Sequence, residues 1–125
     1  VAANSGLVRR ALANLISNAI KATPAGHDIV LRCSASPSGA RVEVQNPGPP
    51  IPAADLPRIF DRFFRSGQTR APRSEGHGLG LAIVRAIARM HGGDVDAVSD
   101  GRGTVVGITL RGPVSPAASG NITKP

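Results

Sequence analysis

Three polar side chains are spaced so that they share one side of a helix. Asn14, Asn18 and Lys21 belong to a periodic segment, Ser5 to Lys21, and lie opposite its apolar residues. An amide oxygen can join a Mg²⁺ shell of phosphate oxygens and waters, and an ammonium one turn further on can meet the phosphates as a point charge. Two asparagines are poor helix formers, which favours a functional reason for them. The alternative is the ordinary solvated face of a surface helix.

A glycine-rich segment, Gly76-His77-Gly78-Leu79-Gly80-Leu81, opens a second helical pattern that runs from Leu79 to Met90. Alternating glycines let backbone N–H groups approach a phosphate, which a helix N-terminus then favours electrostatically. The spacing is neither that of the dinucleotide fingerprint nor that of a P-loop, so both of those folds are disfavoured. A flexible hinge before the helix is the alternative, and His77 is expected to be a lid residue rather than an acid or base.

A third candidate is the proline-stiffened loop from Asn46 to Pro52, which follows a strand pattern directly. Such a preorganised loop can present the Asn46 amide to an adenine edge, and an ordinary turn is the alternative. The aromatic residues Phe60, Phe63 and Phe64 lie close together. We expect them to be core and lid-anchor residues rather than a platform for stacking bases.

These residues need a scaffold, and the order of elements predicts one. Strand patterns at Ile29 to Ala35 and Ala40 to Gln45 form one hairpin, and patterns at Asp94 to Ser99 and Thr104 to Arg111 form another. Each hairpin follows one of the helices, which predicts an α+β sandwich with helices on one face of the sheet. Three further segments are a short helical turn at 55–59, a mobile lid at 66–78 and a disordered tail at 112–125.

Composition limits the class of protein. The chain has 125 residues, 41% hydrophobic and 18% charged, which fits one folded domain and excludes a wholly disordered protein. The single cysteine, Cys33, excludes an internal disulfide and fits a reducing compartment. Fifteen basic and eight acidic residues give a net charge of +7, which attracts polyanions. A basic nucleic-acid-binding module is therefore an alternative, although the chain has no Trp or Tyr for base stacking.

Taken together and in this order, the segments resemble the catalytic ATP-binding domain of sensor histidine kinases, in the wider family that includes DNA gyrase. Five motifs carry the resemblance over about residues 7–110. They are Asn14 to Lys21 for the N box, Asn46 to Pro52 for the first glycine box, Ile59 to Arg65 for the F box, Gly76 to Val84 for the second glycine box, and Gly103-Thr104 for the last Gly-Thr element.

The resemblance implies a two-layer α/β sandwich of the Bergerat type, with a mixed sheet, and a site for ATP and Mg²⁺. By this analogy Asn18 is the Mg²⁺ ligand, Lys21 faces the phosphates, and Arg65 reaches the terminal phosphate or the partner domain; these three are the implied catalytic residues. The implied ATP-binding residues are Asn14, Asn18, Lys21, Asn46, Gly48, Ile51, Phe60, Arg65, Gly76, His77, Gly78, Leu79, Gly80, Leu81 and Thr104.

Three positions depart from the family pattern. The adenine-reading residue is usually Asp but here is Asn46, which accepts from the adenine amine without a charge. Pro50 replaces the second glycine of the loop, and Ala22 stands where Tyr is common. We therefore expect weaker nucleotide binding. The Asn-Pro-Gly form of the loop and the residues after it resemble the heavy-metal sensor kinases, especially copper and silver sensors.

The resemblance also implies what lies outside this chain. None of His27, His77 or His91 fits the phosphoacceptor pattern, so the acceptor histidine is expected in an upstream dimerisation domain. The reaction would be in-line transfer of the γ-phosphoryl group from Mg-ATP, with this domain supplying positioning and charge stabilisation. The domain is expected over residues 1–111, its first strand cut short. Alone it would be a monomer that turns over poorly.

The expected setting is the cytoplasmic part of a bacterial inner-membrane sensor. The full protein would be a homodimer that signals to a response regulator, contacts the membrane only through segments absent here and binds no nucleic acid. Two alternatives stay within the fold: a serine/threonine kinase of the anti-sigma type, and a degenerate domain that binds nucleotide without transferring phosphate.

Overall fold

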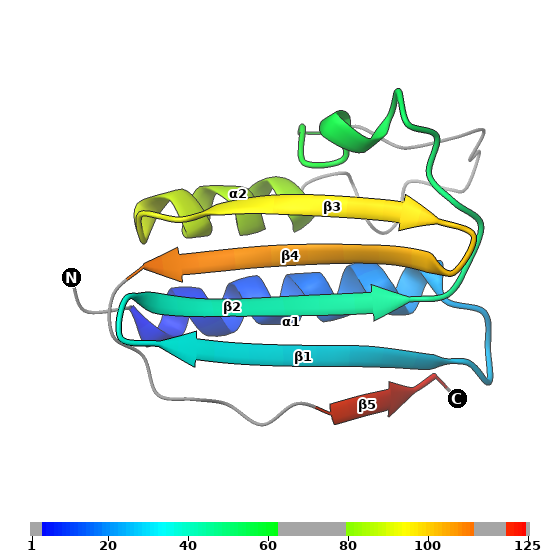
Figure 1. Cartoon of the computed structure of the whole chain (residues 1–125), viewed down its shortest axis with the longest axis horizontal. Coiled ribbons are helices and arrows are strands. Elements are labelled where there is room, and N and C mark those ends of the chain that lie inside the picture. Colours follow the sequence, from blue (N-terminus) through cyan, green and yellow to red (C-terminus); the bar gives the residue numbers. More distant parts are fainter. Residues whose placement is uncertain (1–3, 63–79, 112–119, 125) are drawn as a thin grey trace.

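The computed structural model describes residues 4–62, 80–111 and 120–124. Over these residues the chain forms two layers, a five-stranded sheet and a pair of helices that cover one of its faces (Figure 1). This confirms the α+β sandwich that the order of elements predicts. The core lies between the layers, and it is built from aliphatic side chains of both helices and of the inward-facing strand positions.

Helix α1 (Ser5–Ala22) begins and ends where its sequence predicts. The side chain of Asn4 accepts a hydrogen bond from the Leu7 N–H at 3.0 Å, which caps the N-terminus. Ala11, Leu15 and Ala19 recur every fourth residue and are buried against the sheet and the second helix. The polar residues between them therefore face away from the core.

The sheet has the strand order β3-β4-β2-β1-β5. Strands β1 (Asp28–Ser36) and β2 (Gly39–Asn46) form the first predicted hairpin, and β3 (Asp94–Asp100) and β4 (Gly103–Arg111) form the second. The expectation of a mixed sheet is wrong for the described strands, because every pair of neighbours is antiparallel. Strands β2 and β3 do run in the same direction, but β4 lies between them (Figure 1).

Two further elements follow β2. A short 3₁₀ helix, η1 (Leu56–Arg58), lies at the predicted helical turn, and helix α2 (Gly80–Met90) packs beside α1. The apolar side of α2 is buried at Leu81, Val84, Ile87 and Ala88. The predicted lid at 66–78 lies outside the described residues.

The C-terminal segment departs from expectation. Residues 120–123 form strand β5 (Gly120–Thr123), which pairs antiparallel with β1 at the edge of the sheet. The prediction of a disordered tail is therefore wrong for these residues, because the open edge of β1 supplies hydrogen-bond partners that a composition rule does not consider. None of the described helices is both long and apolar enough to cross a bilayer.

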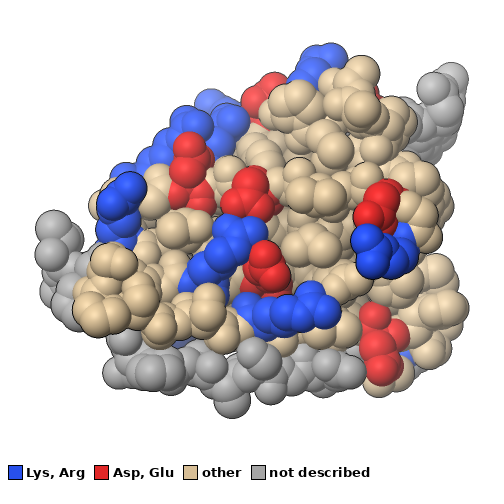
Figure 2. Space-filling view, viewed as in Figure 1, with Lys and Arg blue, Asp and Glu red and all other residues tan. Residues whose placement is uncertain are grey.

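None of the described helices covers the other face of the sheet, which carries interleaved charges of both signs (Figure 2). Arg41 on β2 reaches across Gly107 on β4 and pairs with Asp96 on β3 at 2.8 Å, while it also bonds Glu43 at 2.9 Å. The hydrogen bond from Arg41 holds the pKa of Asp96 below its usual range, against the opposing effect of burial. This network ties three strands together from the outside.

Candidate functional site

One end of the sandwich collects most of the polar residues singled out in the sequence. The C-terminal end of α1, the end of β2 and the start of β4 lie there, and the N-terminal end of α2 points toward it (Figure 1). Antiparallel pairing places Asn46, the last residue of β2, opposite Thr104 near the start of β4. Residues from three separate motifs therefore meet at a single edge of the fold.

Asn46 is nearly buried, with 5% of its surface exposed. Its amide nitrogen donates a hydrogen bond to the carbonyl oxygen of Pro47 at 3.0 Å, which sets the orientation of the side chain. No described residue donates to its amide oxygen. A buried carboxamide with a fixed nitrogen and an available oxygen is suited to accept a hydrogen bond from a ligand amine.

A hydroxyl pair holds the loop after Asn46. The Thr104 hydroxyl lies 2.8 Å from the Ser99 hydroxyl, and Ser99 in turn accepts the Ile51 N–H at 2.8 Å. Thr104 is 6% exposed, so its hydroxyl depends on this partner. Sequence reasoning did not single out Ser99, although the hairpin register alone would have placed it opposite Thr104.

Two glycines permit the backbone contacts around this loop. Gly103 has φ of 124°, and a Cβ there would collide with the carbonyl oxygen of Asn46. Gly48 has φ of 148°, and a Cβ there would lie 3.1 Å from the carbonyl oxygen of Ala22 at the end of α1. Both positions favour glycine because L side chains rarely adopt these angles, and at Gly103 the Asn46 carbonyl also leaves no room for a Cβ. The loop is therefore seated against α1 on one side and against β4 on the other.

The polar side of α1 faces away from the sheet. Asn14 and Asn18 are half-buried, whereas Lys21 in the last turn is exposed. The Asn14 amide nitrogen is the only buried side-chain nitrogen or oxygen of the described residues that has no hydrogen-bond partner. Leaving such a donor unpaired costs roughly 1–3 kcal/mol, which makes it a candidate for a bond to a ligand oxygen.

Two of the predicted site residues have side chains in the core. Phe60 is 6% exposed and Leu81 is 9% exposed, and both belong to the central apolar cluster. The placement of Phe60 agrees with its interpretation as a core residue. Leu81 therefore offers the site its backbone only, one residue after α2 begins at Gly80.

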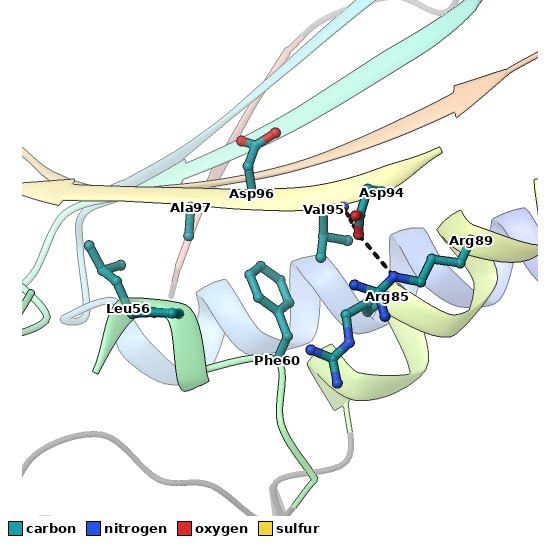
Figure 3. A pocket seen from close by; sticks show the side chains of 9 residues that line it. Leu56, Phe60, Arg85, Arg89, Asp94, Val95, Asp96 and Ala97 are labelled. Atoms are coloured by element: carbon teal, nitrogen blue, oxygen red, sulfur yellow. Dashed lines mark hydrogen bonds and ion pairs between the residues drawn. The ribbon is translucent and has the colours of Figure 1, made fainter. Parts of the chain in front are cut away.

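A cavity of about 370 Å³ opens elsewhere, between η1, α2 and the edge strand β3 (Figure 3). Leu56, Phe60, Val95 and Ala97 form its apolar wall, and Arg89 pairs with Asp94 at its rim at 3.2 Å. Of the predicted site residues only Phe60 lines it. This cavity is therefore separate from the polar end of the sandwich.

The remaining predicted residues, Arg65 and Gly76 to Leu79, lie outside the described residues. Lys21, Asn14 and Asn18 of α1, the Asn46–Pro52 loop and Thr104 are the part of the predicted site that the structure describes. Within the described segments, no group of three or more His, Cys, Asp or Glu side chains could hold a metal ion.

Comparison with known proteins decides the family. Residues 3–114 match the family model described as histidine kinase-, DNA gyrase B- and HSP90-like ATPase. The chain belongs to this ATPase family. The sensor histidine kinase CusS of Escherichia coli K12 is 49% identical over 110 residues, which is 88% of this chain and 23% of that protein. The chain thus spans less than a quarter of this relative's length.

Solved structures give the same answer for the fold of this ATPase domain. The mycobacterial sensor histidine kinase MprB superimposes with a TM-score of 0.77 at 34% identity, over 90% of this chain and 76% of that one. Full-length ShkA in complex with AMPPNP gives a TM-score of 0.72 at 31% identity, over 90% of this chain and 23% of that one. The resemblance to the catalytic domains of sensor histidine kinases is confirmed. The anti-sigma and nucleic-acid-binding alternatives are not favoured by these relatives.

Proposed function

We propose that this histidine kinase-type ATPase domain binds Mg-ATP at the polar end of the sandwich. The observation that carries the proposal is the meeting of the α1 polar face, the Asn46–Gly48 loop and Gly103-Thr104 at one edge. The unpaired amide nitrogen of Asn14, in the middle of α1, and the available amide oxygen of Asn46, at the end of β2, supply a donor and an acceptor. These groups match the phosphate and adenine ends of a nucleotide.

In this proposal each end of the nucleotide has its own protein groups. Asn46 accepts from the adenine amine, in a loop that Ser99 and Thr104 hold in place. Asn14 and Lys21 donate to phosphate oxygens, and Asn18 offers an amide oxygen to Mg²⁺. Mg²⁺ held there would supply positive charge that offsets the charge of the phosphates. Arg65 and the Gly76–Leu79 segment complete the phosphate side.

The reaction we infer is transfer of the γ-phosphoryl group to a histidine in a dimerisation domain of the same protein. The chain's own residues orient the phosphates in line with the acceptor and stabilise charge on the transferred group, and no described residue is assigned as a base. The partners follow from that role: a second copy of the full protein and a response regulator. Similarity to CusS and the form of the loop support a metal-responsive sensor.

Calorimetric titration with a non-hydrolysable ATP analogue, with and without Mg²⁺, tests the binding step. We expect one-to-one binding that Mg²⁺ strengthens and that Asn18→Ala weakens at least tenfold in Mg²⁺, since a metal ligand is lost. Ser34→Ala, an exposed change on β1, is the matched control and should bind as the wild type does. Equal binding of the Mg²⁺ complex by Asn18→Ala would contradict the metal assignment, and no binding by the folded wild type would contradict the function.

A further inference from the structure

The last described residues, 120–124, fasten the C-terminal segment to the body of the domain, and we call them the C-terminal latch. Strand β5 pairs with β1 from Asp28 opposite Thr123 to Leu31 opposite Gly120. Beyond the strand, the Lys124 N–H donates to the His27 carbonyl at 3.2 Å, and the Lys124 carbonyl accepts the Gly26 N–H at 2.9 Å. The latch lies beyond residue 114, where the match to the family model ends.

The side chain of Lys124 caps the C-terminal end of α1. Its Nζ donates to the carbonyl oxygens of Ile20 and Thr23, each at 2.8 Å. The Ile20 carbonyl also accepts the Thr23 N–H at 3.3 Å, and both carbonyls lie at the C-terminal end of α1, the negative end of the helix dipole. A cation bonded to two of them forms charge-assisted hydrogen bonds, which are stronger than neutral ones.

The capped turn is also the turn that carries the phosphate-side residues. Lys21 lies within this turn, and Asn18 lies one turn earlier. The Ala22 carbonyl of the same turn packs against Gly48 of the Asn46–Pro52 loop. From inside the fold, the Thr23 hydroxyl donates to the Ala19 carbonyl at 2.6 Å. Lys124 therefore acts on the outer side of a turn whose geometry sets where Lys21 and Asn18 can reach.

We propose that Lys124 is a positioning residue for the groups of the nucleotide site that bind phosphate. It acts through the last turn of α1, and the pairing of β5 with β1 holds it beside that turn. This inference rests on the proposed function for its consequence on nucleotide binding. Its structural premise, that Lys124 stabilises the last turn, stands without any nucleotide. Neither Asn46 nor Thr104 contacts Lys124, and the capped turn meets their loop through the Ala22 carbonyl beside Gly48, so we expect adenine contacts to depend on Lys124 less than phosphate contacts do.

Hydrogen exchange tests the structural premise. Lys124→Met keeps most of the side-chain length but removes the charge and both hydrogen bonds, and Lys124→Arg restores a cationic donor. We expect the amides of Lys21 to Thr23 to exchange roughly fivefold faster in Lys124→Met and near the wild-type rate in Lys124→Arg. Arg9→Met removes the same charge from an exposed position at the other end of α1 and should leave these rates unchanged.

Binding tests the functional consequence, with Mg²⁺ and a non-hydrolysable ATP analogue as one probe and adenosine as the other. We expect Lys124→Met to raise the Kd for the analogue roughly threefold to fivefold, because the binding-competent turn is populated less of the time. The Kd for adenosine should change less than the Kd for the analogue, and Lys124→Arg should recover analogue binding. A general loss of structure in the domain would instead weaken the binding of both ligands by the same factor.

The outcomes separate the two proposals. Unchanged exchange at Lys21 to Thr23, or equal loss of adenosine and analogue binding, overturns the role given to Lys124. Faster exchange with unchanged analogue binding also overturns it, because the cap then has no effect on positioning. A wild type that binds neither ligand contradicts the proposed function instead, and the exchange rates still report whether Lys124 holds the turn.

Discussion

Replacing Ser99 by alanine removes one of the two hydroxyls that hold the Asn46–Pro52 loop. The change deletes the acceptor of the Ile51 N–H and the partner of the buried Thr104 hydroxyl. A buried polar group left unpaired costs roughly 1–3 kcal/mol, and water can relieve part of that cost at the half-exposed Ile51. We therefore expect Ser99→Ala to lower the free energy of unfolding by about 2 kcal/mol.

The corresponding change in melting temperature follows from the size of the chain. With about 2.1 cal/mol/K of unfolding entropy per residue, 125 residues give about 0.26 kcal/mol/K. A loss of about 2 kcal/mol then lowers Tm by about 8 °C. Thermal and urea unfolding followed by circular dichroism measure both quantities, with Ser34→Ala on the exposed part of β1 as the control, expected within about 0.5 kcal/mol of the wild type.

A double-mutant cycle with Thr104→Val tests whether the two hydroxyls depend on one another. Valine keeps the shape of threonine without its hydroxyl, so the double variant leaves neither hydroxyl unpaired. We expect the double variant to lose about 1 kcal/mol less than the sum of the single losses. Strictly additive losses, or a Ser99→Ala cost below about 0.5 kcal/mol, would refute the idea that this pair holds the loop.

Two further predictions concern the backbone and the exposed face. Gly103→Ala should lower the free energy of unfolding by about 2 kcal/mol or more in urea titrations, because φ of 124° and the Asn46 carbonyl both oppose a side chain; Gly101→Ala, where nothing lies within 4 Å, is the control. Because Arg41 lowers the pKa of Asp96, the stabilisation from this pair is complete above about pH 4 and lost as the pH falls through the lowered pKa. Asp96→Asn should therefore cost up to about 1 kcal/mol at pH 7, since the carboxylate is half-exposed, and less as the pH falls through the lowered pKa; a cost that does not change with pH would contradict the role of charge.

Local chemistry was enough to predict most of the fold. The capping Asn4, the fourfold spacing of small and aliphatic residues in α1 and the glycine turns before Gly39 and Gly103 each act within a few residues, and the structure has these elements within one or two residues of the expected bounds. Strand β5 was missed because four residues in a Pro-, Ser- and Gly-rich tail form a strand only where a sheet edge accepts them. The parallel direction of β2 and β3 gave no parallel pair because β4 lies between them.

The sequence predicted which residue types belong to the candidate site, but not the hydrogen bonds and packing that hold them. The motifs named Asn14, Asn46 and Thr104, and the structure brings the last two opposite each other. The burial of the unpaired Asn14 nitrogen and the bond from Ser99 to Thr104 arise where segments far apart in the sequence pack together. Residue spacing along the chain does not reveal such packing. The Lys124 cap is the same kind of feature, since it joins the end of the chain to the end of the first helix.

The most direct test of the central claim is to map by NMR which backbone amides shift when Mg²⁺ and a non-hydrolysable ATP analogue are added. We predict that the largest shifts fall at the end of α1, at Asn46 to Ile51 and at Gly103-Thr104, where the three segments meet. Residues around the cavity at β3, such as Leu56 and Val95, should shift little. Shifts concentrated at that cavity, or spread without preference over the basic surface, would contradict the nucleotide site described above.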